Sequence, residues 1–225
     1  MLVKHCLAKH LERMKHLLDK GLAELGVEAS EQQRELWLAY VALLAKWNKA
    51  YNLTAVRDPC EMVSRHILDS LSIAPHIPAK RLLDVGAGAG IPSIPLAILW
   101  PDRQITALDS NGKKTRFMEQ VKNELGLDNF TAVQTRVEGF QADPLYDGIL
   151  SRAYASLGDF VASSQHLLTP AGTFWAMKAV IDTSELSEVL KPYKVSTCLP
   201  LHVPGCVAER HLIAIRRDET TANTL

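Results

Sequence analysis

The stretch Arg81-Leu82-Leu83-Asp84-Val85-Gly86-Ala87-Gly88-Ala89-Gly90-Ile91-Pro92 decides the fold of this chain. Its apolar start predicts a short buried strand, which runs directly into a loop of alternating glycines. Pro92 suits the first turn of a helix, where its missing N–H costs nothing. A strand, a glycine turn and a helix form the nucleotide-binding corner of a doubly wound α/β sheet, at the carboxyl end of its first strand.

The spacing of the glycines indicates which nucleotide the corner fits. Dinucleotide-binding loops read G-x-G-x-x-G, whereas here the third glycine comes early, at Gly90, and Ile91 takes its usual place. Asp84 precedes the loop, and an acidic residue followed by G-x-G-x-G resembles the first motif of class I S-adenosylmethionine-dependent methyltransferases. That cofactor has no pyrophosphate, so it needs no row of helix N–H groups. It has an amino group and a ribose, which a carboxylate and close backbone approach can serve.

Composition narrows the class of protein. The 225 residues are 47% hydrophobic with a formal net charge of zero, so one or two domains are expected and no global basic field indicates nucleic acid. No apolar run approaches the ~18 residues of a membrane helix, and charged residues near the start exclude a signal peptide. The four cysteines show no C-x-x-C spacing, so we expect free thiols, no metal site and a cytoplasmic protein.

Two helices are predicted before the glycine loop. Residues 3–25 are amphipathic and end at Gly26, and their basic face is either a solvated surface or an arm that contacts phosphates. Ser30 is the predicted N-cap of the second helix, with Gln33 completing a capping box. Its expected buried stripe consists of Leu36, Tyr40, Leu43, Leu44 and Trp47.

After the loop, strands and helices alternate. Helices are expected at 91–100, 113–125, 157–168 and 184–190, and strands at 104–108, 130–134, 147–150 and 173–177, with an antiparallel pair at 193–199 and 211–215. Asp109 lies nineteen positions after Gly90, close to the ~20 expected for a ribose-binding carboxylate. The turn Arg136-Val137-Glu138 follows the third strand, where this fold flanks the adenine. Predicted boundaries are a helical extension at 1–60, a core domain at 61–217 and a disordered tail at 218–225.

A polar cluster before the loop predicts one wall of the pocket. Arg65, His66 and Asp69 stand in a helical segment, and the spacing i, i+3 turns His66 and Asp69 the same way. After the fourth strand the chain reads Leu150-Ser151-Arg152-Ala153, without the [DN]-P-P-[YF] motif of amino-group methyltransferases. No cysteine stands where a pyrimidine C5 methyltransferase needs its nucleophile. A ring nitrogen such as guanine N7 loses no proton, so it needs only alignment and electrostatic steering, for which Arg152 is suited.

Several motifs together resemble one family. These are W-N-K-x-Y-N-L-T (47–54), R-H-I-L-D-S (65–70), D-V-G-x-G-x-G-I-P (84–92), L-D-S (108–110), R-V-E (136–138), S-R-A (151–153) and E-R-H (209–211). In this order, over about residues 35 to 215, they resemble the bacterial 16S ribosomal RNA guanine-N7 methyltransferase family, also called glucose-inhibited division protein B. Two features depart from that family: Ser93 replaces a common glycine, and the first helix is an extension.

The resemblance implies a class I methyltransferase fold, with a doubly wound, mostly parallel, seven-stranded sheet. It implies S-adenosylmethionine as cofactor and a guanine of 16S ribosomal RNA or the small subunit, near the decoding centre, as acceptor. We further expect a monomer that contacts no membrane and no metal. The predicted cofactor-binding residues are Gly86, Gly88, Gly90, Ile91, Asp109, Ser110, Val137, Glu138 and Arg152; the predicted catalytic residues are Arg152, His66 and Asp69; and the predicted substrate-binding residues are Asn52, Arg65, Lys178, Arg210 and His211.

Other functions stay open at this point. The neutral charge favours a methyltransferase acting on a small molecule or a protein, whereas the basic residues near the predicted pocket disfavour it. A nicotinamide-dependent oxidoreductase is disfavoured by Ile91 in place of the third glycine. A non-enzymatic RNA-binding role is the remaining alternative.

Overall fold

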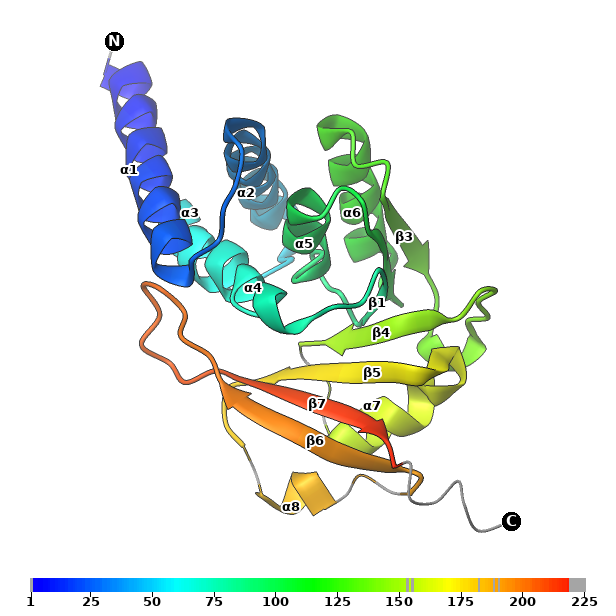
Figure 1. The fold of residues 1–225 in the computed structure, drawn as a ribbon. Coiled ribbons are helices and arrows are strands. Elements are labelled where there is room, and N and C mark those ends of the chain that lie inside the picture. Colours follow the sequence, from blue (N-terminus) through cyan, green and yellow to red (C-terminus); the bar gives the residue numbers. More distant parts are fainter. Residues whose placement is uncertain are drawn as a thin grey trace.

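The computed structural model describes residues 2–152, 154, 156–181, 183–187, 189 and 191–218, with the backbone alone described at 2–9 and 183. These residues include one seven-stranded sheet in the order β3-β2-β1-β4-β5-β7-β6 (Figure 1). Its strands are β1 (Arg81–Val85), β2 (Gln104–Asp109), β3 (Phe130–Gln134), β4 (Tyr146–Ser151), β5 (Leu168–Lys178), β6 (Tyr193–Pro200) and β7 (His211–Arg217). β7 is antiparallel to both β5 and β6, and the other neighbours are parallel. The predicted doubly wound, mostly parallel sheet is confirmed.

The strand β5 starts at Leu168, earlier than the predicted residue 173. Leu168 pairs with Tyr146, and Thr173 pairs with Gly148, so four residues of β5 bulge out opposite a single residue of β4. Pro170 and Gly172 lie in this bulge, and both residue types are typical of turns. The sequence pattern therefore did not predict that the strand begins at Leu168.

Helices cover both faces of the sheet. They are α1 (Leu2–Leu25), α2 (Glu31–Tyr51), α3 (Pro59–Met62), α4 (Asp69–Leu71), α5 (Ser93–Leu99), α6 (Gly112–Leu125), α7 (Leu157–Ser164) and α8 (Thr183–Ser187). Short 3₁₀ turns lie at Ala74–His76, Val137–Gly139 and Gln165–Leu167. The last of these ends the helix predicted at 157–168, because α7 itself stops at Ser164.

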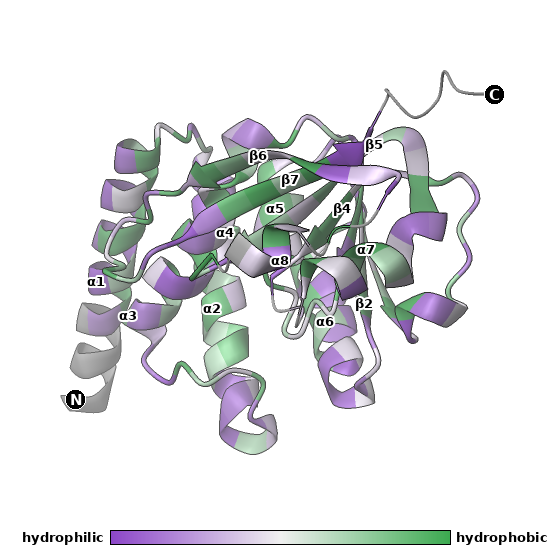
Figure 2. Cartoon of the chain, turned by 90° about the horizontal axis from the view of Figure 1, so that it is seen from below, coloured by the Kyte–Doolittle hydropathy of each residue, from purple (hydrophilic) through white to green (hydrophobic). Residues whose placement is uncertain are grey.

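Two hydrophobic clusters show how the layers pack. The larger cluster joins α1, α2, α5 and α6 to one side of the sheet, through residues such as Leu18, Trp37 and Phe117. The smaller cluster packs α7 on the other side, through Phe160 and Phe174. Figure 2 shows β4 and β7 mainly in the hydrophobic colour, while α1 and α6 alternate between the two colours, as amphipathic helices do.

The helix α2 connects the N-terminal part to the glycine loop. The predicted capping box of Ser30 and Gln33 is present. The Tyr40 hydroxyl donates to the Ala89 carbonyl in the loop at 2.8 Å, and Trp37 Nε1 donates to the Pro95 carbonyl of α5 at 3.1 Å. The predicted buried stripe is partly wrong, because Trp37 and Val41 are fully buried while Leu36, Leu43 and Trp47 are only half-buried.

The predicted helical segment before β1 is divided into three pieces. Between α3 and α4, residues Val63–Leu68 form a π-helix. A π-helix widens the turn and is frequent at functional sites, and this one carries Arg65 and His66. Sequence periodicity gives no signal for this wider turn.

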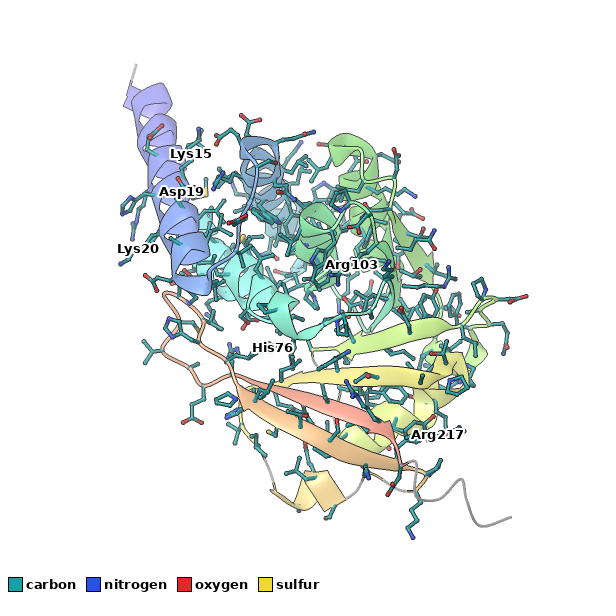
Figure 3. All side chains as sticks on the ribbon, viewed as in Figure 1. Lys15, Asp19, Lys20, His76, Arg103 and Arg217 are labelled. Carbon is teal, nitrogen blue, oxygen red and sulfur yellow. The ribbon has the colours of Figure 1, made fainter. Side chains whose placement is uncertain are left out.

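Charged side chains cover the outside of the molecule. Figure 3 shows Lys20 projecting from α1 away from the rest of the chain, and that residue is exposed. Arg103 differs, because its guanidinium lies 3.7 Å from the Trp100 ring and Nη1 donates to the Ile77 carbonyl at 2.7 Å. Among the described helices, none has the length and apolar character needed to cross a membrane. The disordered tail was predicted at 218–225. Asp218 donates its N–H to the Pro192 carbonyl, and residues 219–225 lie outside the described residues.

Candidate active site

The glycine loop leaves β1 at the point where the strand order reverses. β1 lies between β2 and β4, and a ligand in a doubly wound fold binds outside the carboxyl ends of the strands at this reversal. Gly86 and Gly88 have φ values of 72° and 62°, which L side chains rarely adopt. A Cβ added at either position meets no described atom within 4 Å. Both glycines therefore border open space, where a ligand can approach the backbone.

The end of β2 holds this loop in place. The N–H groups of Gly86 and Ala87 both donate to the Leu108 carbonyl at 2.9 Å, and the Gly88 N–H donates to Asp109 Oδ2 at 2.9 Å. Gly90 and Ile91, which are also predicted to bind the cofactor, lie differently. A Cβ at Gly90 would meet the Ile94 side chain at 2.3 Å, so Gly90 allows α5 to pack closely, and Ile91 is buried.

A cleft of about 440 Å³ lies beside the loop. Five predicted cofactor-binding residues line it: Gly86, Asp109, Ser110, Val137 and Glu138. Lys114 and Tyr154 line it too and were missed by the sequence analysis. Lys114 could have been predicted, because it lies in the first turn of the helix that follows Asp109 and is therefore close to the end of β2.

Asp109 is the best-placed carboxylate in this cleft. It is 7% exposed, and its two oxygens accept the N–H groups of Gly88 and Asn111 at 2.9 and 2.8 Å. These bonds orient the carboxylate, and Lys114 Nζ lies 3.6 Å from Oδ2. A carboxylate has about four acceptor positions, so these partners do not fill it. Those positions suit the two hydroxyl groups of a ribose.

Asp84 lies beneath the loop and does not border the cleft. It is fully buried on β1, and Oδ2 accepts the Ser93 N–H at the start of α5 at 3.2 Å. Burial raises the pKa of this carboxyl to about 6. Asp84 therefore braces the strand–loop–helix corner, and Ser93, which departs from the family pattern, is its partner.

A second cluster forms around Asp69, at the carboxyl end of β4. Asp69 is fully buried, and it pairs with Arg152 Nη2 at 3.1 Å and Arg210 Nε at 2.9 Å. Arg152 Nη2 also donates to the Arg65 carbonyl at 2.9 Å. The structure thus brings together the predicted Arg152, Asp69 and Arg210, with Asp69 positioning the two guanidinium groups.

His66 lies next to this cluster and is also buried. Its Nδ1 lies 2.9 Å from the Arg65 carbonyl and its Nε2 lies 3.0 Å from Thr54 Oγ1. A carbonyl only accepts, so we assign the proton to Nδ1, and Nε2 accepts from the threonine. Burial, together with the nearby charge of Arg152, lowers the pKa of His66 to about 4. The imidazole is therefore neutral at physiological pH.

The predicted substrate-binding residues fall into two groups, one at the ends of β5 and β7 and one, Asn52 and Arg65, in the segment before β1. Lys178, Arg210 and His211 lie together at the ends of β5 and β7, where Lys178 and His211 are paired in register. Lys178 Nζ lies 2.9 Å from the Glu185 carboxylate. Arg65 is half-exposed and pairs with Glu61, and Asn52 caps α2, where its Oδ1 accepts from Arg57 at 2.8 Å.

Comparison with known proteins decides the family. The family model for rRNA small subunit methyltransferase G (GidB) matches residues 33–213, well over half of the chain. This chain belongs to that family. Ribosomal RNA small subunit methyltransferase G of Pseudomonas syringae pv. tomato is 52% identical over 200 residues, which cover 89% of this chain and 95% of the relative. The protein of the same name from Hydrogenovibrio crunogenus is 50% identical over 214 residues, covering 93% of this chain and 99% of the relative.

Solved structures agree on the fold of this methyltransferase G family member. The glycopeptide N-methyltransferase MtfA in complex with S-adenosylmethionine superposes with a TM-score of 0.57, covering 68% of this chain and 94% of that one at 15% identity. The predicted class I methyltransferase fold is confirmed. With the family shown, S-adenosylmethionine is the cofactor, and the open glycines, the oriented Asp109 and the cleft fit it.

Proposed function

We propose that this chain methylates N7 of a guanine in 16S ribosomal RNA, near the decoding centre of the small subunit. Membership of the methyltransferase G family supports the RNA substrate. The choice of guanine N7 as the acceptor atom rests on the contacts of Asp69 and His66, which are both already bonded to other groups. Asp69 is paired with two arginines, and the His66 imidazole is occupied on both nitrogens.

Among the described side chains near Arg152, the Asp69 carboxylate and the His66 imidazole are thus both engaged by other groups, which suits a ring nitrogen that loses no proton. When bound, S-adenosylmethionine supplies the methyl group as a sulfonium electrophile. Guanine N7 attacks with its own lone pair, and the new C–N bond forms as the C–S bond breaks, without loss of a proton. The enzyme therefore needs to align the two reactants and to stabilise charge rather than to remove a proton.

Arg152 is the residue that we propose to meet the acceptor. It follows β4, its side chain is 24% exposed, and its contacts with the Asp69 carboxylate and the Arg65 carbonyl both use Nη2. A guanidinium has five N–H donors, so others are available for guanine O6 or for the carboxylate of the cofactor. Ribose binding by Asp109 and adenine packing against Val137 complete the proposed arrangement.

The proposal includes a cytoplasmic, monomeric enzyme. A ribosomal RNA acceptor implies a bacterial cytoplasmic reaction. Lys178, Arg210 and His211 at the edge of the sheet are proposed to contact the RNA backbone.

Methyl transfer to defined substrates tests this proposal. The purified protein is incubated with methyl-labelled S-adenosylmethionine and either naked 16S RNA or small subunits from a strain lacking this protein. We expect label at one guanine, with the strand cleavage after borohydride and aniline that marks N7 methylation. Absence of label from every assembly state would reject the proposal, as would transfer to a nuclease-resistant acceptor.

A further inference from the structure

A cluster outside the active site combines three metal-binding chemistries. His10 on α1, Asp58 at the N-cap of α3 and Cys60 within α3 point their ligand atoms at one another. His10 Nε2 lies 3.5 Å from Asp58 Oδ1 and 3.8 Å from Cys60 Sγ. All three ligand atoms lie within 4.8 Å of one another. The spacing of cysteines could not predict this cluster, because His10 and Cys60 are 50 positions apart.

Two of the three separations are close to those around a tetrahedral zinc ion. Zinc binds thiolate sulfur at ~2.3 Å and imidazole nitrogen or carboxylate oxygen at ~2.0–2.1 Å, which places ligand atoms about 3.3–3.5 Å apart. The two distances from His10 Nε2, 3.5 and 3.8 Å, therefore need a closure of only a few tenths of an ångström. The ligand atoms of Asp58 and Cys60 lie within 4.8 Å of each other and would move together when the ion binds. Sulfur, nitrogen and oxygen together favour Zn²⁺ or a similar transition metal over Mg²⁺ and Ca²⁺, which prefer oxygen alone.

A backbone hydrogen bond and Pro59 hold Asp58 and Cys60 in place relative to each other. Asp58 Oδ1 accepts the Cys60 N–H at 3.0 Å, which fixes the carboxylate relative to the thiol, and Pro59 between them has a restricted backbone. Cys60 is 3% exposed, whereas the side chains of His10 and Asp58 are 42% and 43% exposed. An ion can enter from that exposed side.

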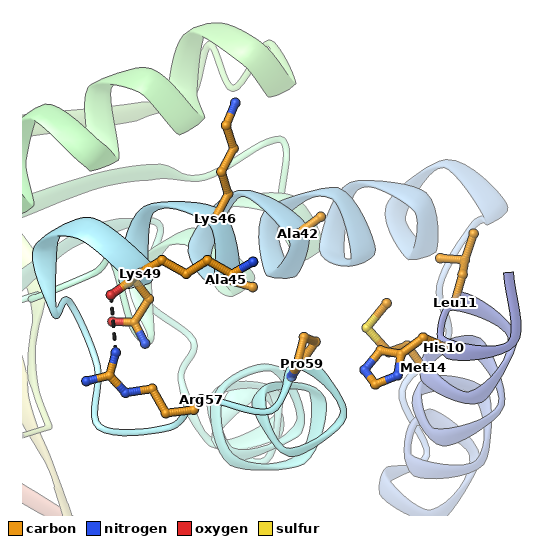
Figure 4. A pocket seen from close by; sticks show the side chains of 10 residues that line it. His10, Leu11, Met14, Ala42, Ala45, Lys46, Lys49, Arg57 and Pro59 are labelled. Atoms are coloured by element: carbon orange, nitrogen blue, oxygen red, sulfur yellow. Dashed lines mark hydrogen bonds between the residues drawn. The ribbon is translucent and has the colours of Figure 1, made fainter. Parts of the chain in front are cut away.

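The contacts that are present without a metal explain the cluster poorly. An exposed histidine–carboxylate pair contributes little to stability, and a sulfur contact of 3.8 Å is at the long limit for a hydrogen bond. The cluster stands beside a groove of about 760 Å³ between α1 and α2. Figure 4 shows the His10 ring pointing from α1 toward Pro59 at the start of α3, across the end of this groove. A metal here would tie α1 to α3 where α1 leaves the core.

We propose that His10, Asp58 and Cys60 bind one Zn²⁺-type ion, which clamps the N-terminal helix to α3. The site would be structural and independent of methyl transfer, because it shares no residue with the active site. This proposal departs from the sequence-based expectation of no metal site.

Metal titration of the full-length, reduced protein tests the site. We expect one Zn²⁺ per chain by calorimetry, and a near-ultraviolet thiolate-to-cobalt absorption when Co²⁺ is used as the probe. His10→Ala and Cys60→Ser should each weaken Zn²⁺ binding by about 100-fold or more, because losing even a group that only hydrogen-bonds to a metal ligand costs about 10–100-fold. Asp58→Asn keeps the N-cap acceptor but removes the charge, and should weaken binding as well.

Cys198→Ser is the matched control, because Cys198 is an exposed thiol on β6. It should bind both metals as the unmodified protein does. His10→Ala changes a half-exposed residue, so it remains informative if Cys60→Ser fails to fold. Zn²⁺ binding that is equal in the unmodified protein and His10→Ala would overturn the proposal, as would a cobalt–thiolate band that disappears in Cys198→Ser.

Discussion

Gly86 and Gly126 have the same left-handed backbone but different surroundings. Their φ values are 72° and 66°, and a Cβ at either position meets no described atom within 4 Å. Gly86 lines the proposed cofactor cleft, whereas Gly126 ends α6. An alanine at Gly126 therefore introduces backbone strain alone, whereas an alanine at Gly86 introduces the same strain and also places a methyl group in the cleft.

Gly86→Ala should weaken cofactor binding, while Gly126→Ala should not. Both substitutions should lower the free energy of unfolding by about 1–2 kcal/mol, because the left-handed conformation disfavours a Cβ. The Gly86 methyl group also enters the cleft, where overpacking of 1–3 kcal/mol corresponds to roughly 5- to 150-fold in affinity. Calorimetric titration with S-adenosylhomocysteine measures this. Equal affinities for the two variants would contradict the assignment of the cleft.

Arg152→Ala should impair methyl transfer more than stability. Asp69 keeps Arg210 as a partner in this variant, so we expect only a small change in the free energy of unfolding. We expect turnover to fall about 100-fold, because the reaction loses a charge-stabilising hydrogen-bond donor. Asp69→Ala instead leaves two arginines without their buried carboxylate and should cost about 3–5 kcal/mol. Turnover assays and urea unfolding of both variants test this. A strongly destabilised Arg152→Ala with normal turnover would be the contrary result.

At the scale of elements, α2 is a support for the cofactor loop. Tyr40 and Trp37 are both fully buried on α2, and each donates one side-chain hydrogen bond to a backbone carbonyl. Only the Tyr40 bond reaches the glycine loop, because Trp37 bonds to α5. The N-terminal helices are therefore connected to the site through Tyr40.

Tyr40→Phe should weaken cofactor binding severalfold, whereas Trp37→Phe should leave it nearly unchanged. Each substitution leaves a buried carbonyl without its partner, so both should lower the unfolding free energy by about 1–3 kcal/mol. The change in affinity is expected only where the loop loses its anchor. Titration with S-adenosylhomocysteine compares the two variants, and equal affinities would show that α2 does not position the loop.

The sequence could predict elements better than contacts between them. β3 and the capping box at Ser30 have the predicted residues, because a buried apolar run and a local hydrogen bond leave direct signals. The π-helix at Val63–Leu68 has no such signal. The glycine loop and Asp109 were found from local spacing, whereas the pairing of Asp69 with Arg210 spans 141 positions and depends on the whole fold.

At the scale of the whole molecule, two buried groups give opposite dependences of stability on pH. The pKa of His66 falls from 6.5 to about 4 in the folded state, so its contribution is present above pH 6.5 and lost as the pH falls toward 4. The pKa of Asp84 rises from 3.8 to about 6, so its contribution is present below pH 3.8 and lost as the pH rises through 6. Each shift corresponds to about 3 kcal/mol, so the two nearly cancel between pH 4 and 6.

Single substitutions should reveal these hidden contributions. Relative to His66→Gln, the unmodified protein should lose about 3 kcal/mol as the pH falls from 7 to 4. Relative to Asp84→Asn, it should lose a similar amount as the pH rises from 4 to 7. Urea unfolding at several pH values gives both differences, in which the contributions of other groups cancel. Differences that stay constant with pH would contradict the pKa shifts that burial gives these two groups.

We propose that the cleft beside Gly86 holds S-adenosylmethionine with its ribose on Asp109. The most direct measurement is a crystal structure of the protein soaked with S-adenosylhomocysteine and, separately, with NAD. We expect S-adenosylhomocysteine in the cleft, with ribose hydroxyls within hydrogen-bond distance of the Asp109 carboxylate, and no NAD there. NAD lodged in the cleft, or S-adenosylhomocysteine bound elsewhere, would contradict it.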